Sequence, residues 1–298
     1  MLGMAATLEN LAAHLQQNRR QTRPGRRNEA VKLQAHAVEK PWGRNDLASV
    51  FGAANRQIGE IWFEHPAGKE LPLLIKYIFT SEKLSVQVHP NDEEARDRGL
   101  ERGKNECWYI LDAAKGATLG LGLKPRVSAH ALRAAAIDGS IESLMDWRPV
   151  IAGDFFYVPA GTVHAIGAGI MLLEVQQNAD VTYRLFDYGR PRELHLDDGI
   201  AVSKLEEYAS FNVRPSSGPV DTVLVDGPYF SLIRASSTDH IPPSLAMRRR
   251  WIMPLQGRAE SDGDSAIAGE CLLLEPSNEL ALTDSAIVLI GVEGSVAG

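Results

Sequence analysis

The sequence is poor in cysteine and has no long hydrophobic run. Cys107 and Cys271 are the two cysteines among 298 residues, so we expect no disulfide framework and a reducing environment. No apolar segment approaches the roughly 20 residues that span a bilayer. We therefore expect a cytoplasmic protein with no membrane partner.

The chain also lacks the charge and the short motifs of several functional classes. A net charge of −7 argues against a nucleic-acid partner, and we interpret the short run Arg248-Arg249-Arg250 as a solvated or salt-bridged patch. We find no P-loop, G-x-S-x-G, H-E-x-x-H or G-x-G-x-x-G motif. These absences argue against the common nucleotide-binding, serine-hydrolase and zinc-protease sites.

Residues 1–35 differ from the rest of the chain, and we interpret them as an N-terminal extension. Leu8, Leu11 and Leu15 indicate a short amphipathic helix, and an arginine-rich stretch around Pro24-Gly25 follows it. The extension is expected to be loosely docked or disordered. An organelle-targeting segment is the alternative, because the stretch is rich in arginine and poor in acidic residues.

From His36 onward the pattern is typical of an all-β protein. Short runs rich in branched and aromatic residues alternate with Gly, Pro and Asp turns, which predicts a sandwich or jelly roll. Pro41-Trp42-Gly43 marks an expected turn. The predicted strands are 58–63, 73–79, 85–89, 107–111, 118–123, 155–158, 170–175, 181–186, 222–225, 229–234, 251–255, 271–274 and 286–290.

A helical insertion and a linker interrupt this pattern. Ser128 is a plausible N-cap for an alanine-rich helix over 129–137, and Ser140 for a second helix over 141–145, so the insertion covers 128–147. Pro215–Pro219 suggests a linker. We therefore predict a catalytic domain over 36–214 and a second β-domain over 215–298, which lacks clustered ligand residues.

The stretch from Ser85 to Asp92 carries the first candidate site residues. Alternation puts Val86 and Val88 on one strand face and Ser85, Gln87 and His89 on the other. A strand that aligns a hydroxyl, an amide and an imidazole can present polar groups to a ligand. Proline at 90 and Asn91-Asp92 end the strand in a turn.

Two further residues could join His89 in a metal site. Glu106 stands where a polar loop enters an apolar strand, and if buried it would need a cation. His164 follows a strand that ends in Pro159-Ala160-Gly161. Two histidines and one carboxylate suit either zinc or non-haem iron, and Gln87 could add an amide oxygen.

Other charged residues lie close to these candidates in the sequence. Lys104 precedes Glu106 by two residues and would share its face. Arg184 interrupts an apolar strand, which is unfavourable unless it meets an anion or a developing negative charge. A structural salt bridge to Asp187 or Glu174 is the alternative interpretation of this arginine.

Together these motifs resemble those of a known family. Gly153 to His164 fits the second cupin motif, G-x5-P-x-G-x2-H, although Ala168 replaces its usual asparagine. The first cupin motif usually opens His-x-His, but here it is Gln87-Val88-His89. These departures are similar to those of the type I mannose-6-phosphate isomerases, in their short bacterial form. The matching stretches are Lys40–Gly43, Gly59–Trp62, Leu71–Lys76, Leu84–Asp92, Gly103–Leu111, Gly153–Gly169 and Leu173–Arg190.

The resemblance covers roughly residues 36–200 and implies a fold of two cupin barrels, mainly β, and one zinc ion per chain. It implies that the zinc ligands are Gln87, His89, Glu106 and His164, that Arg184, Lys104 and Glu174 are catalytic, and that Ser85, Lys76 and Arg190 bind substrate. Ser85 and Arg190 are our candidates for the phosphate, because hydroxyl and guanidinium groups donate to it.

The implied reaction interconverts mannose 6-phosphate and fructose 6-phosphate through an enediol. We expect a small sugar phosphate as the partner and a monomer or homodimer. Two alternatives remain at this point: a cupin oxygenase, because two histidines and a carboxylate also bind iron, and a non-catalytic sugar-binding cupin.

Overall fold

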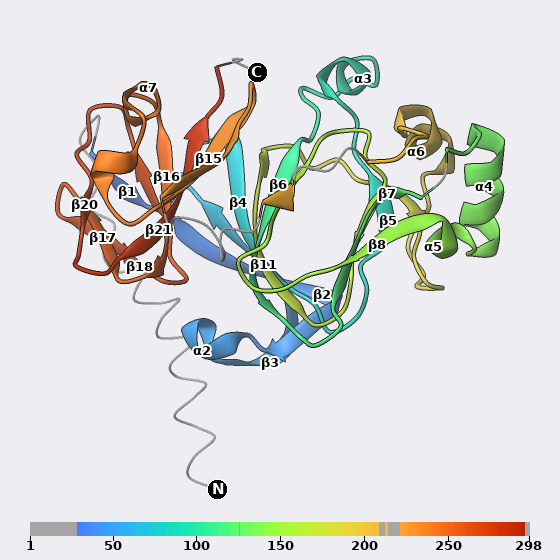
Figure 1. Cartoon of the computed structure of the whole chain (residues 1–298), viewed down its shortest axis with the longest axis horizontal. Coiled ribbons are helices and arrows are strands. Elements are labelled where there is room, and N and C mark those ends of the chain that lie inside the picture. The colour runs from blue at the N-terminus through green and yellow to red at the C-terminus, as the bar shows by residue number, and fades with distance from the viewer. Residues whose placement is uncertain (1–28, 125, 209–211, 214–220, 296–298) are drawn as a thin grey trace, which may run out of the picture. The chain divides into compact units, whose positions relative to one another are not determined.

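The structure, a computed structural model, describes residues 29–124, 126–208, 212–213 and 221–295 (Figure 1). The predicted helix around Leu8–Leu15 and the predicted linker at 215–219 lie outside these residues. Within them, no helix is both long and apolar enough to cross a membrane. Strands dominate, and every strand pairing with an assigned register is antiparallel, so the predicted mainly β class is confirmed.

The described residues form two compact units. Those of Met1–Lys76 and Pro215–Ala297 make one unit, and those of Tyr77–Arg214 make the other. The division falls within β4 (Leu73–Phe79). It differs from the predicted domains, because residues 29–76 group with the C-terminal part. Part of the predicted extension is also strand: β1 (Val31–Lys32) pairs with β19 (Leu272–Leu274).

The first unit is built on a six-stranded antiparallel sheet. Its order is β1, β19, β16 (Arg250–Gln256), β21 (Ile287–Glu293), β15 (Phe230–Ala235) and β14 (Thr222–Asp226). Buried aliphatic side chains such as Ile252, Val288 and Ile290 form its core. The short helical elements η2 (Thr238–His240) and α7 (Pro243–Ala246) follow β15.

Two smaller groups of strands complete this unit. β17 (Arg258–Ser261) lies between β18 (Asp264–Ile267) and β20 (Ala281–Leu282), and the sequence did not predict these three strands. β2 (Gln34–Asp46) pairs with β3 (Ala53–Glu64), and α2 (Ala48–Phe51) connects them. The predicted turn at Pro41-Trp42-Gly43 is wrong. Glu39 and Arg44 both pair with Ile58, so the residues between them form a bulge within one long strand.

The second unit contains two sheets, one of which carries Gln87, His164 and Arg184. Its order is β12 (Tyr183–Phe186), β5 (Val86–Val88), β10 (His164–Ile166), β7 (Thr118–Leu123) and β8 (Met145–Pro149). The other sheet places β6 (Glu106–Ala113) between β9 (Phe155–Val158) and β11 (Ile170–Gln177), with β13 (Asn212–Val213) beside β9.

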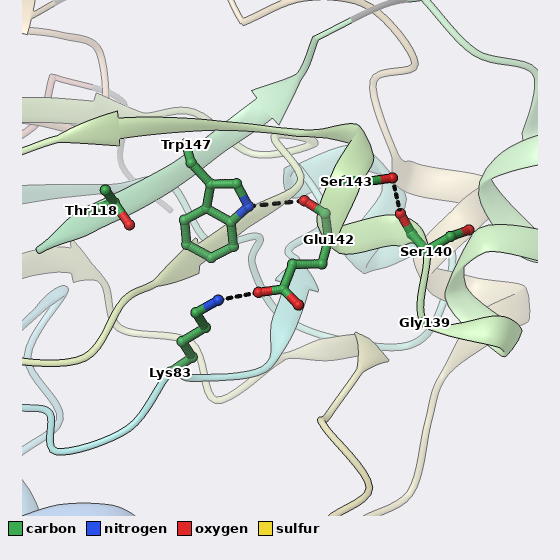
Figure 2. Close-up of a pocket in the computed structure, with 7 residues that line it drawn as sticks. All are labelled: Lys83, Thr118, Gly139, Ser140, Glu142, Ser143 and Trp147. Carbon is green, nitrogen blue, oxygen red and sulfur yellow. Dashed lines mark hydrogen bonds and ion pairs between the residues drawn. The ribbon is translucent and has the colours of Figure 1, made fainter. Parts of the chain in front are cut away.

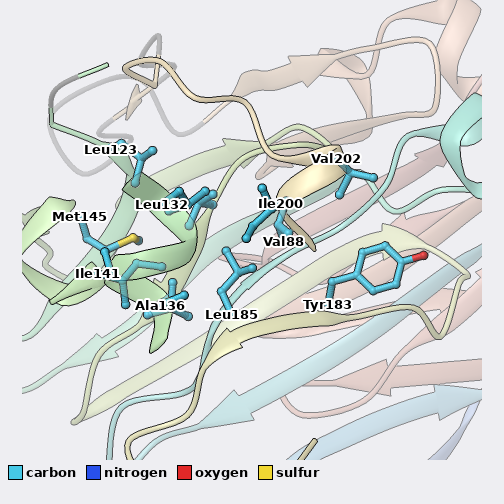
Figure 3. Packing of buried hydrophobic residues seen from close by; sticks show 14 of the residues in the cluster. Val88, Leu123, Leu132, Ala136, Ile141, Met145, Tyr183, Leu185, Ile200 and Val202 are labelled. Carbon is cyan, nitrogen blue, oxygen red and sulfur yellow. The ribbon is translucent and has the colours of Figure 1, made fainter. Parts of the chain in front are cut away.

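Three helices cover the outer face of the β5 sheet. α4 (Ala129–Asp138), α5 (Ile141–Leu144) and α6 (Leu196–Val202) lie along this side of the second unit (Figure 1). Leu132, Ile141 and Ile200 pack with Val88 and Leu185 in one buried cluster (Figure 3). This apolar layer fixes which face of β5 is left for polar side chains.

Both predicted helices of the insertion are present, as α4 and α5, but its last residues form a strand. The Ser128 hydroxyl accepts a hydrogen bond from Ala131 N at 3.1 Å, which is the expected N-cap. Ser140 does not cap α5 with its side chain. The chain is already β8 at Met145, where Trp147 pairs with Gly120, because a residue without Cβ leaves room for the indole ring.

Candidate metal centre

The polar face of β5 forms one side of the candidate centre. Val86 and Val88 are fully buried in the apolar cluster, and Ser85, Gln87 and His89 take the opposite face. The next turn is fixed by a capping box at the start of α3 (Asp92–Arg96). There Asn91 Oδ1 accepts from Glu94 N, while Asn91 N donates to the Glu94 carboxylate.

The strand register aligns three predicted site residues in one row. Gln87 lies directly opposite His164 on β10 and opposite Arg184 on β12. Residues opposite each other in antiparallel strands share a face of the sheet. The amide of the central strand therefore has the imidazole on one side and the arginine on the other.

Glu106 on β6 meets both histidines. Glu106 Oε2 lies 3.4 Å from His89 Nε2, and Glu106 Oε1 lies 3.3 Å from His164 Nε2. All three side chains are buried, and one candidate ligand atom from each lies within 4.8 Å of the others. The structure therefore brings together three of the four predicted metal ligands from three different strands or strand ends.

The other ring nitrogen of each histidine is held by a backbone carbonyl. His89 Nδ1 lies 2.8 Å from Val181 O, and His164 Nδ1 lies 2.8 Å from Thr162 O. A carbonyl oxygen can only accept, so each Nδ1 carries a proton. A neutral imidazole with its proton on Nδ1 presents the lone pair of Nε2, which is the form that binds metals.

Electrostatics keep both imidazoles neutral and the carboxylate charged. Burial, together with the nearby Lys104 ammonium, lowers the pKa of His89 to about 3. Burial also lowers the pKa of His164. Burial alone would raise the pKa of Glu106, but Lys104, whose Nζ lies 3.0 Å from Glu106 Oε2, helps to hold it well below its usual range. The histidine contacts of Glu106 are therefore not salt bridges.

The Nε2 lone pairs of His89 and His164 thus face the oxygens of Glu106 without a proton between them. Within the described residues, His89 Nε2 and both oxygens of Glu106 are buried and make no hydrogen bond of normal geometry, although the Lys104 ammonium lies 3.0 Å from Glu106 Oε2. Such an arrangement is unfavourable unless a cation is shared. Two imidazole nitrogens and a carboxylate suit zinc or a related transition metal, so these residues fit a divalent ion.

Gln87 borders this group, but its amide nitrogen faces it. Gln87 Nε2 lies 3.2 Å from His164 Nε2, and Gln87 Oε1 accepts a hydrogen bond from Ser85 Oγ at 3.1 Å. Ligation through Oε1 would require the opposite orientation of the amide. The Ser85 hydroxyl is compatible with both orientations, because it can accept as well as donate.

A hydrogen-bonded network fixes the loop that carries Lys104. Gln177 Oε1 accepts from both Asn105 N and Asn105 Nδ2, at 2.9 and 2.7 Å. Gln177 Nε2 donates to Asp92 Oδ1, which also accepts from Gly103 N. Lys104 N donates to Pro90 O. The peptide units on both sides of Lys104 are therefore held, which supports the position of its ammonium beside Glu106.

Glu174 lies on the same sheet face as Glu106. It is buried on β11, opposite Trp108, and its Oε2 accepts from Trp108 Nε1 at 2.9 Å. The Trp108 ring in turn makes an edge contact with His164, at 5.4 Å between ring centroids. Trp108 thus connects the second carboxylate to a candidate ligand.

Arg184 retains donors that its neighbours do not use. Among the described residues, its guanidinium makes one hydrogen bond, from Nη1 to Glu193 O at 3.2 Å. Its backbone is held by His195, which exchanges hydrogen bonds with Arg184 N and O. Partial burial and the charge of Arg192 lower the pKa of Arg184. A site that disfavours positive charge in this way would favour a bound anion.

The two remaining predicted substrate residues have other contacts. Arg190 donates to Asp187, to the Glu82 carboxylate and to Lys83 O. Lys76 belongs to the first unit, where it is buried with its Nζ 4.9 Å from the Trp62 ring. These contacts do not place the two residues at the metal centre.

A cavity of about 490 Å³ lies beside the helical insertion (Figure 2). None of the predicted site residues lines it. Lys83 and Glu142 form an ion pair there, and Trp147 Nε1 donates to Glu142 O. Since its charged groups already pair with each other, the cavity offers no alternative to the buried centre.

Two relatives of this chain carry the name mannose-6-phosphate isomerase. A scan against protein-family models finds no match. The mannose-6-phosphate isomerase of Streptococcus mutans is 36% identical over 250 residues, which cover 69% of this chain and 78% of that protein. The chain belongs to the mannose-6-phosphate isomerase family. A second family member, ManA of Bacillus subtilis, is 41% identical over 191 residues, or 59% of this chain and 60% of its own.

Solved structures of the family share the fold. The mannose 6-phosphate isomerase of Bacillus subtilis has a TM-score of 0.71 and 24% identity, with 88% of this chain and 99% of that chain covered. A variant of the phosphomannose isomerase of Salmonella typhimurium has a TM-score of 0.67 and 14% identity, with 89% and 100% covered. At these identities the likeness concerns the fold alone.

Several residues around the centre escaped the sequence analysis. Trp108, Asn105, Gln176 and Gln177 looked like parts of a strand and its adjoining loop, without a ligand type among them. Alternation could have shown that Trp108 shares the face of Glu106, and that Gln176 shares the face of Glu174. The pairing that brings these two faces together joins β6 and β11, far apart in sequence, so local pattern could not show it.

Proposed function

We propose that this protein interconverts mannose 6-phosphate and fructose 6-phosphate, with one zinc ion held by His89, Glu106, His164 and Gln87. Membership of the mannose-6-phosphate isomerase family supports the reaction. The observation that carries the proposal is the buried group in which two imidazole lone pairs face one carboxylate.

Bound there, a divalent ion supplies Lewis acidity toward a carbonyl or hydroxyl oxygen of the sugar. The protein supplies the donor atoms in a set orientation, since Val181 O and Thr162 O fix both rings. Because the site is buried, electrostatic interactions inside it are stronger than in water.

The reaction moves a proton from C2 to C1 and another from O2 to O1, through an enediol. Lys104, paired with Glu106 as an ammonium, is suited to donate a proton to a sugar oxygen. Glu174 is the candidate to take the C2 proton, with one of its oxygens oriented by Trp108. The unused guanidinium donors of Arg184 would stabilise the negative charge that develops on the oxygens.

Ser85, Lys76 and Arg190 remain our candidates for substrate binding. The Ser85 hydroxyl lies on the polar face of β5, next to Gln87. Arg190 could bind phosphate by exchanging its contact with Glu82, whose side chain is exposed. Such exchange would leave its bond to the buried Asp187 intact.

The experiment that tests the function is an assay combined with metal analysis. The purified protein should convert mannose 6-phosphate to fructose 6-phosphate, without consuming oxygen, and should contain about one zinc per chain. Treatment with EDTA should abolish turnover, and added zinc should restore it. Turnover that is indifferent to metal would contradict the proposed centre, and absence of turnover in the zinc-loaded protein would contradict the reaction.

The expected location, oligomeric state and two-barrel architecture stay predictions. Within the described residues, Cys107 and Cys271 are buried and unlinked, which is compatible with the expected cytoplasmic location. A monomer or homodimer, and a description of the chain as two cupin barrels, remain to be tested. Sedimentation of the purified protein would determine the oligomeric state.

A further inference from the structure

Gln176 lies beside the metal centre, although no motif singled it out. It is fully buried near the end of β11 and lies directly opposite Glu106 on β6. Opposite residues of antiparallel strands share a face. Glu174, two residues before Gln176, lies opposite Trp108, two residues after Glu106. This pair shares the same face, and Trp108 donates a hydrogen bond to Glu174. The Gln176 amide is therefore on the face that carries the candidate ligand Glu106.

The orientation of this amide is fixed by its nitrogen. Gln176 Nε2 donates to Gln177 O at 3.0 Å and to Ala179 O at 3.2 Å. An amide nitrogen has two hydrogens, so both are used. Rotating the amide would set its oxygen against these two carbonyl oxygens and lose both bonds. Oε1 is thereby committed to the role of acceptor.

That acceptor has no hydrogen-bond partner in the part of the chain that the structure describes. Among residues 29–124, 126–208, 212–213 and 221–295, no group donates a hydrogen bond to Gln176 Oε1. A buried acceptor without a donor is destabilising, and a group bound from outside the chain would supply the missing partner. The Lys104 ammonium, which pairs with Glu106, does not donate to it either.

We propose that Gln176 Oε1 accepts a hydrogen bond from a hydroxyl group of the sugar phosphate, which makes Gln176 a substrate-binding residue. The inference rests on the proposed function. The chemistry favours a hydroxyl, because Trp108 Nε1, the donor on this face of β6 and β11, is already bound to Glu174, and a sugar offers several O–H donors. A hydroxyl group is also the feature that distinguishes this sugar from its deoxy analogues.

The test pairs a variant with substrate analogues. Gln176→Met keeps the length and volume of the side chain but removes the acceptor. Val175→Ala, on the same strand with its side chain on the other face, controls for loss of packing. The zinc-loaded wild type and both variants are assayed with mannose 6-phosphate and with its 3-deoxy and 4-deoxy analogues, and zinc content is measured for each protein.

We expect Gln176→Met to lower kcat/KM for mannose 6-phosphate about tenfold, the effect of losing one hydrogen bond, with zinc content unchanged. For one deoxy analogue, wild type and Gln176→Met should agree within about twofold, since the analogue lacks the hydroxyl that the amide binds. Val175→Ala should discriminate among the three sugars as the wild type does.

Three results would overturn the inference. Equal kcat/KM for wild type and Gln176→Met with every sugar would show that the proposed hydrogen bond does not form. Loss of zinc from Gln176→Met would assign the acceptor to the metal centre instead of the sugar. If Gln176→Met does not fold, the wild type decides: equal turnover of all three sugars contradicts the proposal, and a loss of tenfold or more with one analogue supports it. A zinc-loaded wild type inactive on mannose 6-phosphate would contradict the proposed function as well.

Discussion

His89 and His164 lie side by side with their ring centroids 4.9 Å apart, each Nε2 near a different oxygen of Glu106 and each Nδ1 directed to a backbone carbonyl. The two rings come from different strand ends, yet the same device sets their tautomer. Because a carbonyl fixes each ring, both Nε2 lone pairs point into the shared space before any ion arrives. This preorganisation reduces the conformational entropy lost on binding a metal.

The pH dependence of the metal-free protein should reveal these neutral rings. In the folded protein the pKa of His89 is lowered to about 3, and that of His164 is lowered too, from an unfolded value near 6.5. Between these values the unfolded chain binds protons that the folded chain does not. The free energy of unfolding should therefore fall as the pH drops below about 6.5, by up to roughly 1.4 kcal/mol per pH unit for each ring.

Urea unfolding of the metal-free protein at pH 7.5, 6 and 5 measures this effect. The variant His89→Asn loses one of the two titrations, so its stability should fall less steeply over the same range. His130→Asn, on the exposed start of α4, is the control and should keep the wild-type slope. Parallel slopes for His89→Asn and wild type would mean that His89 is not held neutral.

Removing the Lys104 charge should impair the reaction more than the metal site. Without this ammonium the pKa of Glu106 rises, because burial is then opposed by less positive charge. We expect Lys104→Met to lower kcat by about 10²–10⁴-fold, as loss of a proton-transferring group does, with zinc still bound. Lys83→Met, which removes an ion pair at the helical insertion, should keep kcat near the wild-type value. If kcat of Lys104→Met were near normal, the lysine would have no catalytic role.

Arg184 should matter for turnover and little for metal content. Replacing it with Ala removes the guanidinium donors opposite Gln87. We expect kcat to fall by about 100–1000-fold, the typical effect of losing one donor to a developing negative charge. Arg133→Ala, which breaks an exposed pair with Asp197, serves as the control. Loss of zinc from Arg184→Ala would instead assign the arginine to the structure of the centre.

The network behind Lys104 predicts a stability effect. Gln177→Leu leaves Asn105 N and Nδ2 without their acceptor in a buried position. We expect the free energy of unfolding to fall by about 2–5 kcal/mol, as two buried donors lose their partner. Asp92→Asn is the matched control, because its Oδ1 can still accept from Gly103 N and Gln177 Nε2. Equal stability of Gln177→Leu and wild type, by urea unfolding, would show that water replaces the amide.

The sequence predicted the parts of this site that depend on local pattern. The alternation around Val86 and Val88 predicted both faces of β5, since side chains alternate along any strand. The alanine-rich helix and its Ser128 cap were equally local. The roles of Gln176 and Gln177 depend on which strand pairs with β6, and that choice is made by long-range packing.

The errors have the same origin. Pro41-Trp42-Gly43 contains strong turn residues, yet the chain continues as β2 because its pairing with β3 absorbs them in a bulge. Trp147 was predicted as the last residue of the helical insertion, yet it lies on β8 because Gly120 on β7 accommodates its ring. In both cases a partner strand overrode the local preference.

Val86 and Val88 fix which face of β5 is turned toward the candidate centre, although neither takes part in the reaction. Inserting or deleting a single residue in this strand would exchange its two faces, so that Gln87 and His89 would point into the apolar cluster beneath α4 and α6 and aliphatic side chains would face the candidate metal centre. Substitutions can therefore change the size of these hydrophobic residues, whereas a change in the length of the strand would destroy the candidate site.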